Sequence, residues 1–254
     1  MAYNLNNKLV IAISSRALFD LEEENQIFEK DGLDAYYKYQ LENEDKSLKK
    51  GTGYRLVENI LKINSFFSSD ERQVEVIILS KNNAATSLRI TNAINDLKLD
   101  IIRSAWTSGT NISNYLKAFK VDLFLSADDN DVLNAIENGV AAAKILHSNE
   151  NINNSSNNQV RIAFDGDAVL FSEESELVYK NHGLEAFIEH EKENRNNPLE
   201  MGPFAKLLLT IAKIQAKFPT DKSPIRTALV TARSAPTHER VIKTFNLWGV
   251  RVDE

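Results

Sequence analysis

Two stretches of the chain share one pattern: residues 9–20 read LVIAISSRALFD, and residues 160–171 read VRIAFDGDAVLF. Each begins with a mostly apolar run of strand length and continues into a loop of small and polar residues. A short apolar run bounded by turn-forming residues is typical of a buried strand. The pattern therefore predicts two equivalent strand–loop units, 151 residues apart.

The similarity extends well beyond these stretches. When the sequence is shifted against itself by 151 residues, 22 of the 90 pairs between positions 11 and 100 are identical, and no gap is needed. Unrelated chains of ordinary composition match far less often. We interpret the pattern as a tandem duplication, with domains at 8–148 and 160–254 joined by a polar, Asn-rich linker at 149–159.

Within each copy, apolar strands alternate with helices. Further strands are expected at 74–79 and 225–230, and apolar residues recur at helical spacing in 56–63 and 207–214. Strands that alternate with helices form parallel sheets covered on both faces. The sequence thus predicts an α/β protein of two tandem Rossmann-like domains, in which ligands bind at the carboxyl ends of the strands.

Composition excludes several classes of protein. The 254 residues include 30 Lys and Arg against 36 Asp and Glu, a net charge of −6, and no cysteine. This balance argues against a broad surface for a nucleic-acid polymer, and the lack of cysteine excludes disulfide scaffolds and thiol nucleophiles. No apolar run is long enough to cross a membrane, and the polar N-terminus lacks a signal-peptide pattern, so a cytoplasmic protein is expected.

The loop after the strand at 160–164 contains two carboxylates, Asp165 and Asp167, separated by a glycine. Like charges this close need a cation or a shared proton, and Mg²⁺ prefers such oxygen ligands. Aspartate is also a good helix N-cap. The spacing alone leaves both a metal or catalytic pair and a capping role open.

The strand at 225–230 ends in a second polar loop, Thr231-Ala232-Arg233-Ser234. A hydroxyl, backbone amides and a following helix N-terminus suit phosphate oxygens, and Arg233 could add a positive charge. A simple helix-capping role for Thr231 or Ser234 is the alternative. Because parallel neighbouring strands end at the same sheet edge, we expect this loop to lie beside Asp165.

These residues resemble a known family. The string from Asp165 to Leu170 fits the D-x-D-x-[TV]-[LV] signature of the haloacid dehalogenase superfamily, and Thr231 fits its second motif. The longer strings 163–176 and 230–235, with 13–20 in the first copy, are similar to the cytosolic 5'-nucleotidase type I family. The resemblance covers nearly the whole chain from Leu9 to Glu254.

The resemblance implies Mg²⁺-dependent hydrolysis of an AMP-like nucleoside 5'-monophosphate. Asp165 would be the nucleophile that forms an aspartyl-phosphate, and Asp167 the general acid and base. Asp165 and the backbone carbonyl of Asp167 would also hold the metal, while residues 231–234 bind the phosphate. Segment 172–223 would form a small helical cap whose Phe187, His190 and Asn194 are candidate nucleoside contacts, although Phe187 also suits core packing.

The first copy departs from this pattern. At the 151-residue offset, Asp165, Gly166, Asp167 and Thr231 become Ser14, Ser15, Arg16 and Ser80. Only Asp128-Asp129 resemble an acidic motif of the superfamily, and they have no partner carboxylates in their own copy. The first copy is therefore expected to be non-catalytic and to serve as scaffold, oligomer contact (in a homo-oligomer) or regulatory nucleotide site. The equivalents of Asp128-Asp129 in the second copy would fall beyond Glu254, which predicts an incomplete second domain.

These departures leave two alternative functions open. One is hydrolysis of a different small phosphate monoester by the same residues. The other is a non-catalytic nucleotide-binding or regulatory protein.

Overall fold

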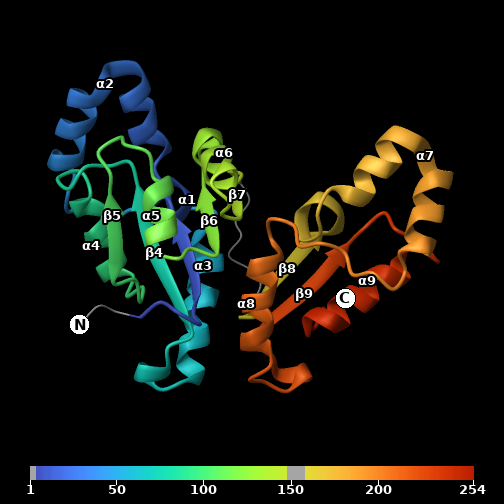
Figure 1. Ribbon diagram of the computed structural model, residues 1–254. Helices are drawn as coiled ribbons and strands as arrows, with labels where there is room; N and C mark the ends of the chain where they lie inside the picture. The colour runs from blue at the N-terminus through green and yellow to red at the C-terminus, as the bar shows by residue number, and fades with distance from the viewer. Residues whose placement is uncertain (1–3, 148–157) are drawn as a thin grey trace. The chain divides into compact units, whose positions relative to one another are not determined.

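The computed structural model describes residues 4–147 and 158–254 (Figure 1). The chain divides into two compact units, with the division between residues 157 and 158. Most of the linker predicted at 149–159 lies outside the described residues.

The first unit contains a five-stranded sheet in the order β5-β4-β1-β6-β7, with every pair parallel. This arrangement confirms the prediction of an α/β fold with a central parallel sheet. The strands are β1 (Leu9–Ile13), β4 (Val74–Ser80), β5 (Arg103–Trp106), β6 (Leu123–Ser126) and β7 (Ala142–Lys144).

Helices connect these strands, as right-handed parallel crossovers require. They are α1 (Ser15–Leu18), α2 (Glu22–Glu42), α3 (Tyr54–Lys62), α4 (Leu88–Asp96), α5 (Ser113–Ala118) and α6 (Asp129–Glu137). A small antiparallel pair, β2 (Phe19–Asp20) and β3 (Lys49–Lys50), joins the two ends of the segment that contains α2. Two short 3-10 turns, η1 (Ile63–Phe66) and η2 (Ser69–Glu71), precede β4.

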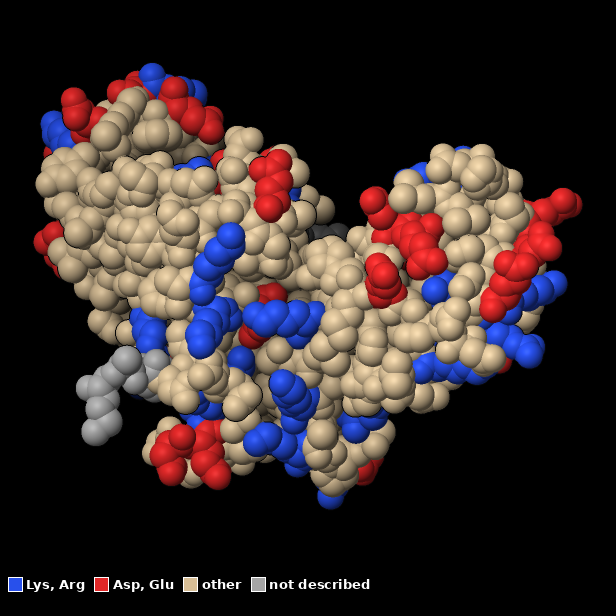
Figure 2. Space-filling model, viewed as in Figure 1, with Lys and Arg blue, Asp and Glu red and all other residues tan. Residues whose placement is uncertain are grey.

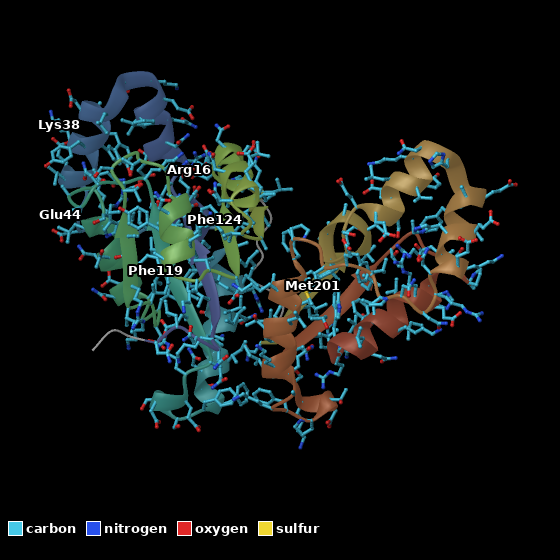
Figure 3. The ribbon with its side chains drawn as sticks, viewed as in Figure 1. Arg16, Lys38, Glu44, Phe119, Phe124 and Met201 are labelled. Atoms are coloured by element: carbon cyan, nitrogen blue, oxygen red, sulfur yellow. The ribbon has the colours of Figure 1, made fainter. Side chains whose placement is uncertain are left out.

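One layer of the first unit's core lies between the sheet and helices α5 and α6. Val10 and Ala12 of β1 point into it, and Phe124 of β6 is completely buried there (Figure 3). All five residues of β1 are buried because this strand lies between β4 and β6. A central strand that is apolar on both faces is what a sheet covered on both sides requires.

The second unit contains a parallel pair of strands, β8 (Val160–Asp165) and β9 (Ile225–Val230). The other elements are η4 (Gly166–Leu170), α7 (Glu174–Glu193), α8 (Ala205–Gln215), η5 (Thr220–Lys222) and α9 (His238–Trp248). Beyond α9 the chain runs along β9, where Asp253 N–H donates to the Thr227 carbonyl and Leu229 N–H to the Glu254 carbonyl. The aromatic ring of Phe171 packs between Phe245 and Trp248 in the core.

The two units repeat the same elements at the offset read from the sequence. Element α3 corresponds to α8, η2 to η5, β4 to β9 and α4 to α9. The strand register is also the same, because Leu9 pairs with Val74 and Val160 pairs with Ile225. Both copies therefore form a parallel strand pair in the same register, as equivalent hydrophobic patterns predict.

Each unit contains a long helix that bends sharply at one glycine. Gly32 in α2 has φ 83° and ψ −174°, and Gly183 in α7 has φ 81° and ψ −175°. Only glycine adopts this backbone conformation without strain. Both helices are therefore arches with two arms (Figure 1), and each arch stands above the carboxyl ends of its own sheet. Among the described residues, no helix is long and apolar enough to cross a bilayer.

Candidate active site

The Asp165 loop and the Thr231 loop lie side by side in the second unit. Strands β8 and β9 are parallel and pair Asp165 with Val230, so both loops leave the same edge of the sheet. A side-chain carbon added to Gly166 would lie 3.5 Å from the Thr231 hydroxyl oxygen. The two polar loops are thus in close contact, as expected from parallel strands that end together.

Asp165 is exposed at the end of β8. One of its oxygens, Oδ1, accepts a hydrogen bond from Gly166 N–H at 2.7 Å, so Asp165 caps the turn that follows it. The other oxygen, Oδ2, makes no hydrogen bond within the described residues. Within residues 158–254, strand β8 pairs only with β9, and Ala163 and Asp165 are exposed. Ala12, the equivalent of Ala163 in the first unit, is buried.

Asp167 pairs with Arg233. The Arg233 Nε lies 3.2 and 3.0 Å from the two Asp167 oxygens, and its Nη2 lies 2.5 Å from Oδ1. The guanidinium therefore provides the positive charge beside Asp167. The backbone N–H of Arg233, one of the amides expected to be free for phosphate, donates instead to Thr231 Oγ1 at 3.2 Å. Ala232 and Ser234 are exposed on either side.

Sequence reasoning missed a buried carboxylate, Glu191, whose side chain is fully enclosed. It accepts hydrogen bonds from the Arg233 guanidinium, from Arg240 at 3.1 Å and from the Ser175 hydroxyl at 2.7 Å. Burial by itself would raise the pKa of Glu191. The Ser175 hydrogen bond and the charges of Arg233 and Arg240 outweigh this effect and hold its pKa below the ordinary value.

Arg233 is held by carboxylates on two sides. Burial disfavours its charged form, but the contacts with Asp167 and Glu191 more than compensate and raise the pKa of Arg233. The guanidinium therefore stays charged although only 1% of its side chain is exposed. Charges buried in this way persist because each is paired and hydrogen-bonded.

The three predicted cap residues all lie on the second arm of α7, and they differ in their contacts. The Phe187 ring lies 5.3 Å from the Arg233 guanidinium and meets the Tyr179 ring edge-on at 6.2 Å. The His190 nitrogens lie 3.1 Å from Glu174 and 3.3 Å from Glu191. Thus Phe187 contacts the charged centre directly, and His190 reaches it through Glu191.

Asn194 is one step further away. It ends α7, and its side-chain amide donates to the His190 carbonyl at 3.0 Å. This is the geometry of a helix C-terminal cap. The structure therefore brings together Asp165, Asp167, Thr231, Arg233 and Phe187, and leaves Asn194 at the end of the arch.

Comparison with known proteins agrees with these motifs. The family model described as 5'-nucleotidase matches residues 1–254. The human protein named cytosolic 5'-nucleotidase 1B is 36% identical over 257 residues, which is 98% of this chain. The chain belongs to the 5'-nucleotidase family. It spans 42% of the length of that human relative.

One feature of the sequence of this family member could have pointed to the cluster around Glu191. Arg89 in the first copy aligns with Arg240 in the second, and it is the only arginine of the first copy that recurs between positions 9 and 103. Both arginines bind the segment that follows the bent helix of their own unit: Arg89 Nε donates to the Lys46 carbonyl, and Arg240 Nε donates to the Asn197 carbonyl. The repeated arginine can be recognised in the sequence, whereas the residues that it contacts cannot.

The buried carboxylate that pairs with this arginine lies on different arms of the bent helix in the two copies. In the first unit, Arg89 lies 2.5 Å from Glu24 and 3.4 Å from Gln40. In the second unit, the equivalent positions are Ser175 and Glu191. The buried acid is on the first arm in α2 and on the second arm in α7, where the more exposed Glu174 of the first arm also lies 3.6 Å from Arg240. Its place on the second arm of α7 lets the buried acid also bind Arg233.

The charged surface around the second arch is mixed. Figure 2 shows acidic side chains over α7, with basic ones beside them. Ion pairs on this surface include Lys180 with Glu176 at 2.6 Å and Lys243 with Glu239 at 2.5 Å. Exposed pairs of this kind contribute little to stability.

Proposed function

We propose that this chain supplies the catalytic residues for hydrolysis of a nucleoside 5'-monophosphate, AMP-like, to a nucleoside and phosphate. The observation that carries the proposal is the meeting of Asp165, Asp167 and Thr231 at the carboxyl ends of β8 and β9. Membership of the 5'-nucleotidase family and the name of the human relative support it. That relative is also named cytosolic, which supports a cytoplasmic location.

Asp165 is the proposed nucleophile. Asp165 is an exposed residue; its Oδ2 accepts no hydrogen bond from the described residues, while Oδ1 is held by Gly166 N–H. A bond forms between Oδ2 and the phosphorus, and the ribose oxygen leaves with a proton from Asp167. Water then attacks the aspartyl-phosphate, Asp167 takes a proton from it, and phosphate departs from Asp165.

Arg233 is the proposed partner of the phosphate. Its guanidinium is charged and already lies against Asp167 and beneath Phe187. Guanidinium groups bind carboxylate and phosphate with the same two-pronged geometry. We therefore expect an incoming phosphate to compete with Asp167 for Arg233, which frees the Asp167 carboxyl to exchange protons with the ribose oxygen.

Magnesium fits the donors at this edge of the sheet. Asp165 Oδ1, which keeps a lone pair beside its hydrogen bond from Gly166 N–H, and the backbone carbonyl of Asp167 are oxygen ligands of the kind that Mg²⁺ prefers. No group of three His, Cys, Asp or Glu side chains suited to a metal occurs in residues 4–147 and 158–254. This fits an ion that keeps several waters and binds through one or two carboxylates and substrate phosphate. When bound, Mg²⁺ supplies positive charge against the phosphoryl oxygens.

The Phe187–Tyr179 pair is the proposed contact for the nucleoside. Two rings at 6.2 Å on opposite arms of α7 provide an aromatic surface above the charged centre. Contacts from His190 and Asn194 to the nucleoside stay predictions, since both side chains are engaged within the arch.

Phosphate release from a panel of nucleoside monophosphates and simple phosphate esters, with and without Mg²⁺, tests the proposal. We expect Mg²⁺-dependent turnover that prefers nucleotides and falls at least a thousandfold in Asp165→Asn. The matched control is Asp128→Asn in the first unit, which should keep turnover within about twofold. Full activity of Asp165→Asn, or an equal loss in Asp128→Asn, would refute the assignment. Faster cleavage of non-nucleotide esters would favour a phosphatase of another substrate.

A further inference from the structure

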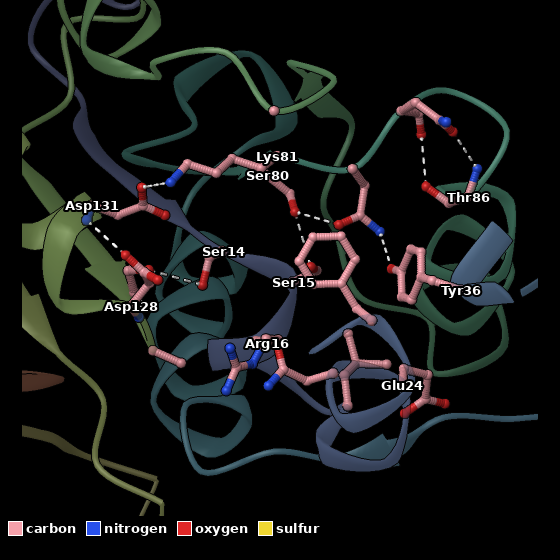
Figure 4. A pocket seen from close by; sticks show the side chains of 18 of the residues that line it. Ser14, Ser15, Arg16, Glu24, Tyr36, Ser80, Lys81, Thr86, Asp128 and Asp131 are labelled. Carbon is pink, nitrogen blue, oxygen red and sulfur yellow. Dashed lines mark hydrogen bonds and ion pairs between the residues drawn. The ribbon is translucent and has the colours of Figure 1, made fainter. Parts of the chain in front are cut away.

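A cavity of about 550 Å³ lies in the first unit at the carboxyl ends of β1, β4 and β6 (Figure 4). It occupies the position that the Asp165–Thr231 site occupies in the second unit, because Ser14 and Ser80 are the equivalents of those two residues. The first copy has lost the paired carboxylates but has kept an open space above its sheet. Small-molecule sites commonly enclose about 300–1,000 Å³.

Four serine hydroxyls form the base of this cavity. Ser14, Ser15, Ser80 and Ser126 are each no more than 8% exposed and follow the ends of the three strands. The Ser15 and Ser80 hydroxyls lie 2.9 Å apart, side by side in Figure 4. A group of neutral hydroxyls can donate several hydrogen bonds to the oxygens of one phosphate.

Two cations line the same cavity. Arg16 stands where the second unit has Asp167, and its Nε is buried without a hydrogen-bond partner in the described residues. Its Nη2 contacts Glu22 at 3.1 Å, and a third of the side chain is exposed. Lys81 follows Ser80 and is 43% exposed. The first unit thus has a hydroxyl and a guanidinium where the second has two carboxylates. An anion can therefore approach this edge of the sheet without a metal ion to offset negative charge.

The carboxylates around the cavity already have partners. Glu24 lies 2.5 Å from Arg89, and Asp131 lies 2.6 Å from Lys81. Asp128 caps α6, where its Oδ1 accepts the Asp131 N–H at 3.0 Å. An arriving phosphate would compete with Asp131 alone for Lys81 and would find the Arg16 Nε unoccupied.

The opposite wall is aromatic. Phe28 and Tyr36, from the two arms of the α2 arch, meet edge-on with their ring centres 5.9 Å apart. Phe28 is 48% exposed and Leu33 is 59% exposed, although both line the cavity. The second unit repeats this ring pair as Tyr179 and Phe187. Apolar rings opposite a polar, cationic base suit a ligand with a flat ring at one end and a phosphate at the other.

We propose that the cavity of the first unit binds a nucleoside monophosphate and does not cleave it. The hydroxyls and Arg16 receive the phosphate, and the Phe28–Tyr36 pair receives the base. With serine at position 14 and arginine at position 16, neither the carboxylate nucleophile nor the carboxyl acid is available. The site is independent of turnover in the second unit, because it needs no metal and forms no covalent intermediate.

The test uses the whole chain with Asp165→Asn, AMP as probe and EDTA present. Calorimetry should show one equivalent of AMP bound, and adenosine should bind at least tenfold more weakly than AMP. Photolabelling with 8-azido-AMP should modify a peptide within residues 21–36. No AMP binding at millimolar concentration, equal binding of adenosine, or labelling confined to residues 174–194 would each overturn the proposal.

Charge and aromatic variants sharpen the assignment. Arg16→Glu should weaken AMP binding at least tenfold, and Phe28→Ala about fivefold. The matched controls are Lys117→Glu, an exposed cation on α5, and Phe66→Ala, an exposed ring in η1. If Arg16→Glu changes the circular dichroism spectrum, Arg16→Gln replaces it with the same expected direction. Affinity equal to that of the controls would refute the site, whether or not the second unit proves to be a nucleotidase.

Discussion

Glu191 is the carboxylate whose replacement most directly tests the charged cluster of the second unit. It is fully enclosed and faces two arginines, Arg233 and Arg240, together with the Ser175 hydroxyl. Removing one member of a buried ion pair costs about 3–5 kcal/mol, because the remaining charge stays buried without its partner. Glutamine keeps the volume and one acceptor oxygen. We therefore expect Glu191→Gln to lower the free energy of unfolding by about 3 kcal/mol.

The first unit provides the compensating change. There the equivalent positions hold Glu24 and Gln40, so Ser175→Glu combined with Glu191→Gln recreates the arrangement around Arg89. We expect the double variant to recover about 1.5 kcal/mol relative to the sum of the two single variants, a coupling typical of residues in one network. Arg233 keeps Asp167 as its partner in both cases, so recovery should be incomplete.

Urea denaturation followed by tryptophan fluorescence measures these values. The chain has two tryptophans, Trp106 in the first unit and Trp248 in the second, so a Trp106→Phe background reports on the second unit. For a unit of this size, 3 kcal/mol corresponds to a melting point lower by about 12–24 °C. Glu193→Gln, an exposed change on the same helix, is the control and should have an effect below about 0.5 kcal/mol.

The pH dependence has a definite sign. Because the folded-state pKa of Glu191 is depressed, its stabilising contribution is present above the ordinary carboxyl pKa and is lost as pH falls through the folded value. The stability difference between wild type and Glu191→Gln should therefore be constant near neutrality and narrow below about pH 4. A neutral effect of Glu191→Gln, or no recovery in the double variant, would refute the cluster as described.

Two further variants test the arch and the first unit. Gly183→Ala should lower the free energy of unfolding, measured by urea denaturation, by about 1–3 kcal/mol. An added side-chain carbon meets no atom within 4 Å, so the loss arises from the backbone angles alone. A stabilised variant would contradict the bend. Tyr36→Phe removes the hydroxyl that accepts hydrogen bonds of 2.9 Å from Gln40 and from Asn82, and it should lower the free energy of unfolding by about 1–2 kcal/mol. Burial raises the pKa of Tyr36, so the neutral phenol stabilises the fold and this contribution is lost as pH rises through the raised value. In urea denaturation at alkaline pH, Tyr36→Phe should therefore lose less stability than wild type does. Tyr115→Phe, a change at an exposed residue, should behave as wild type.

The parallel sheet could be predicted because each of its strands is marked by residues that are neighbours in the sequence. Apolar runs such as Val74–Leu79 mark buried strands, and the unbroken 151-residue offset predicts that the second copy forms the same elements in the same order. The candidate loops were also predictable, since a parallel pair brings the loops after β8 and β9 to one edge whatever the side chains do.

The partners within the site could not be predicted in this way. Arg233, Glu191 and Ser175 come from separate segments, and whether an arginine in a phosphate-like loop faces solvent, phosphate or a carboxylate depends on how α7 bends. The bend arises at Gly183, and a glycine in a helical pattern does not by itself show the sign of its φ angle. For the same reason, the amide of Arg233, expected to be free, is bonded to Thr231.

The amino-acid sequence was enough to establish the 151-residue repeat, the α/β class and the family. It also shows Ser14 and Arg16 in the first copy at the positions equivalent to Asp165 and Asp167. Tertiary structure alone decided that the first copy keeps a cavity above its sheet and that its ring pair, Phe28 and Tyr36, lines it. Repeats and motifs are carried by residues close in the chain, each constrained by its own strand or helix. A cavity and a buried charge cluster are made by side chains far apart in the chain, so they exist only after the arches fold back over their sheets.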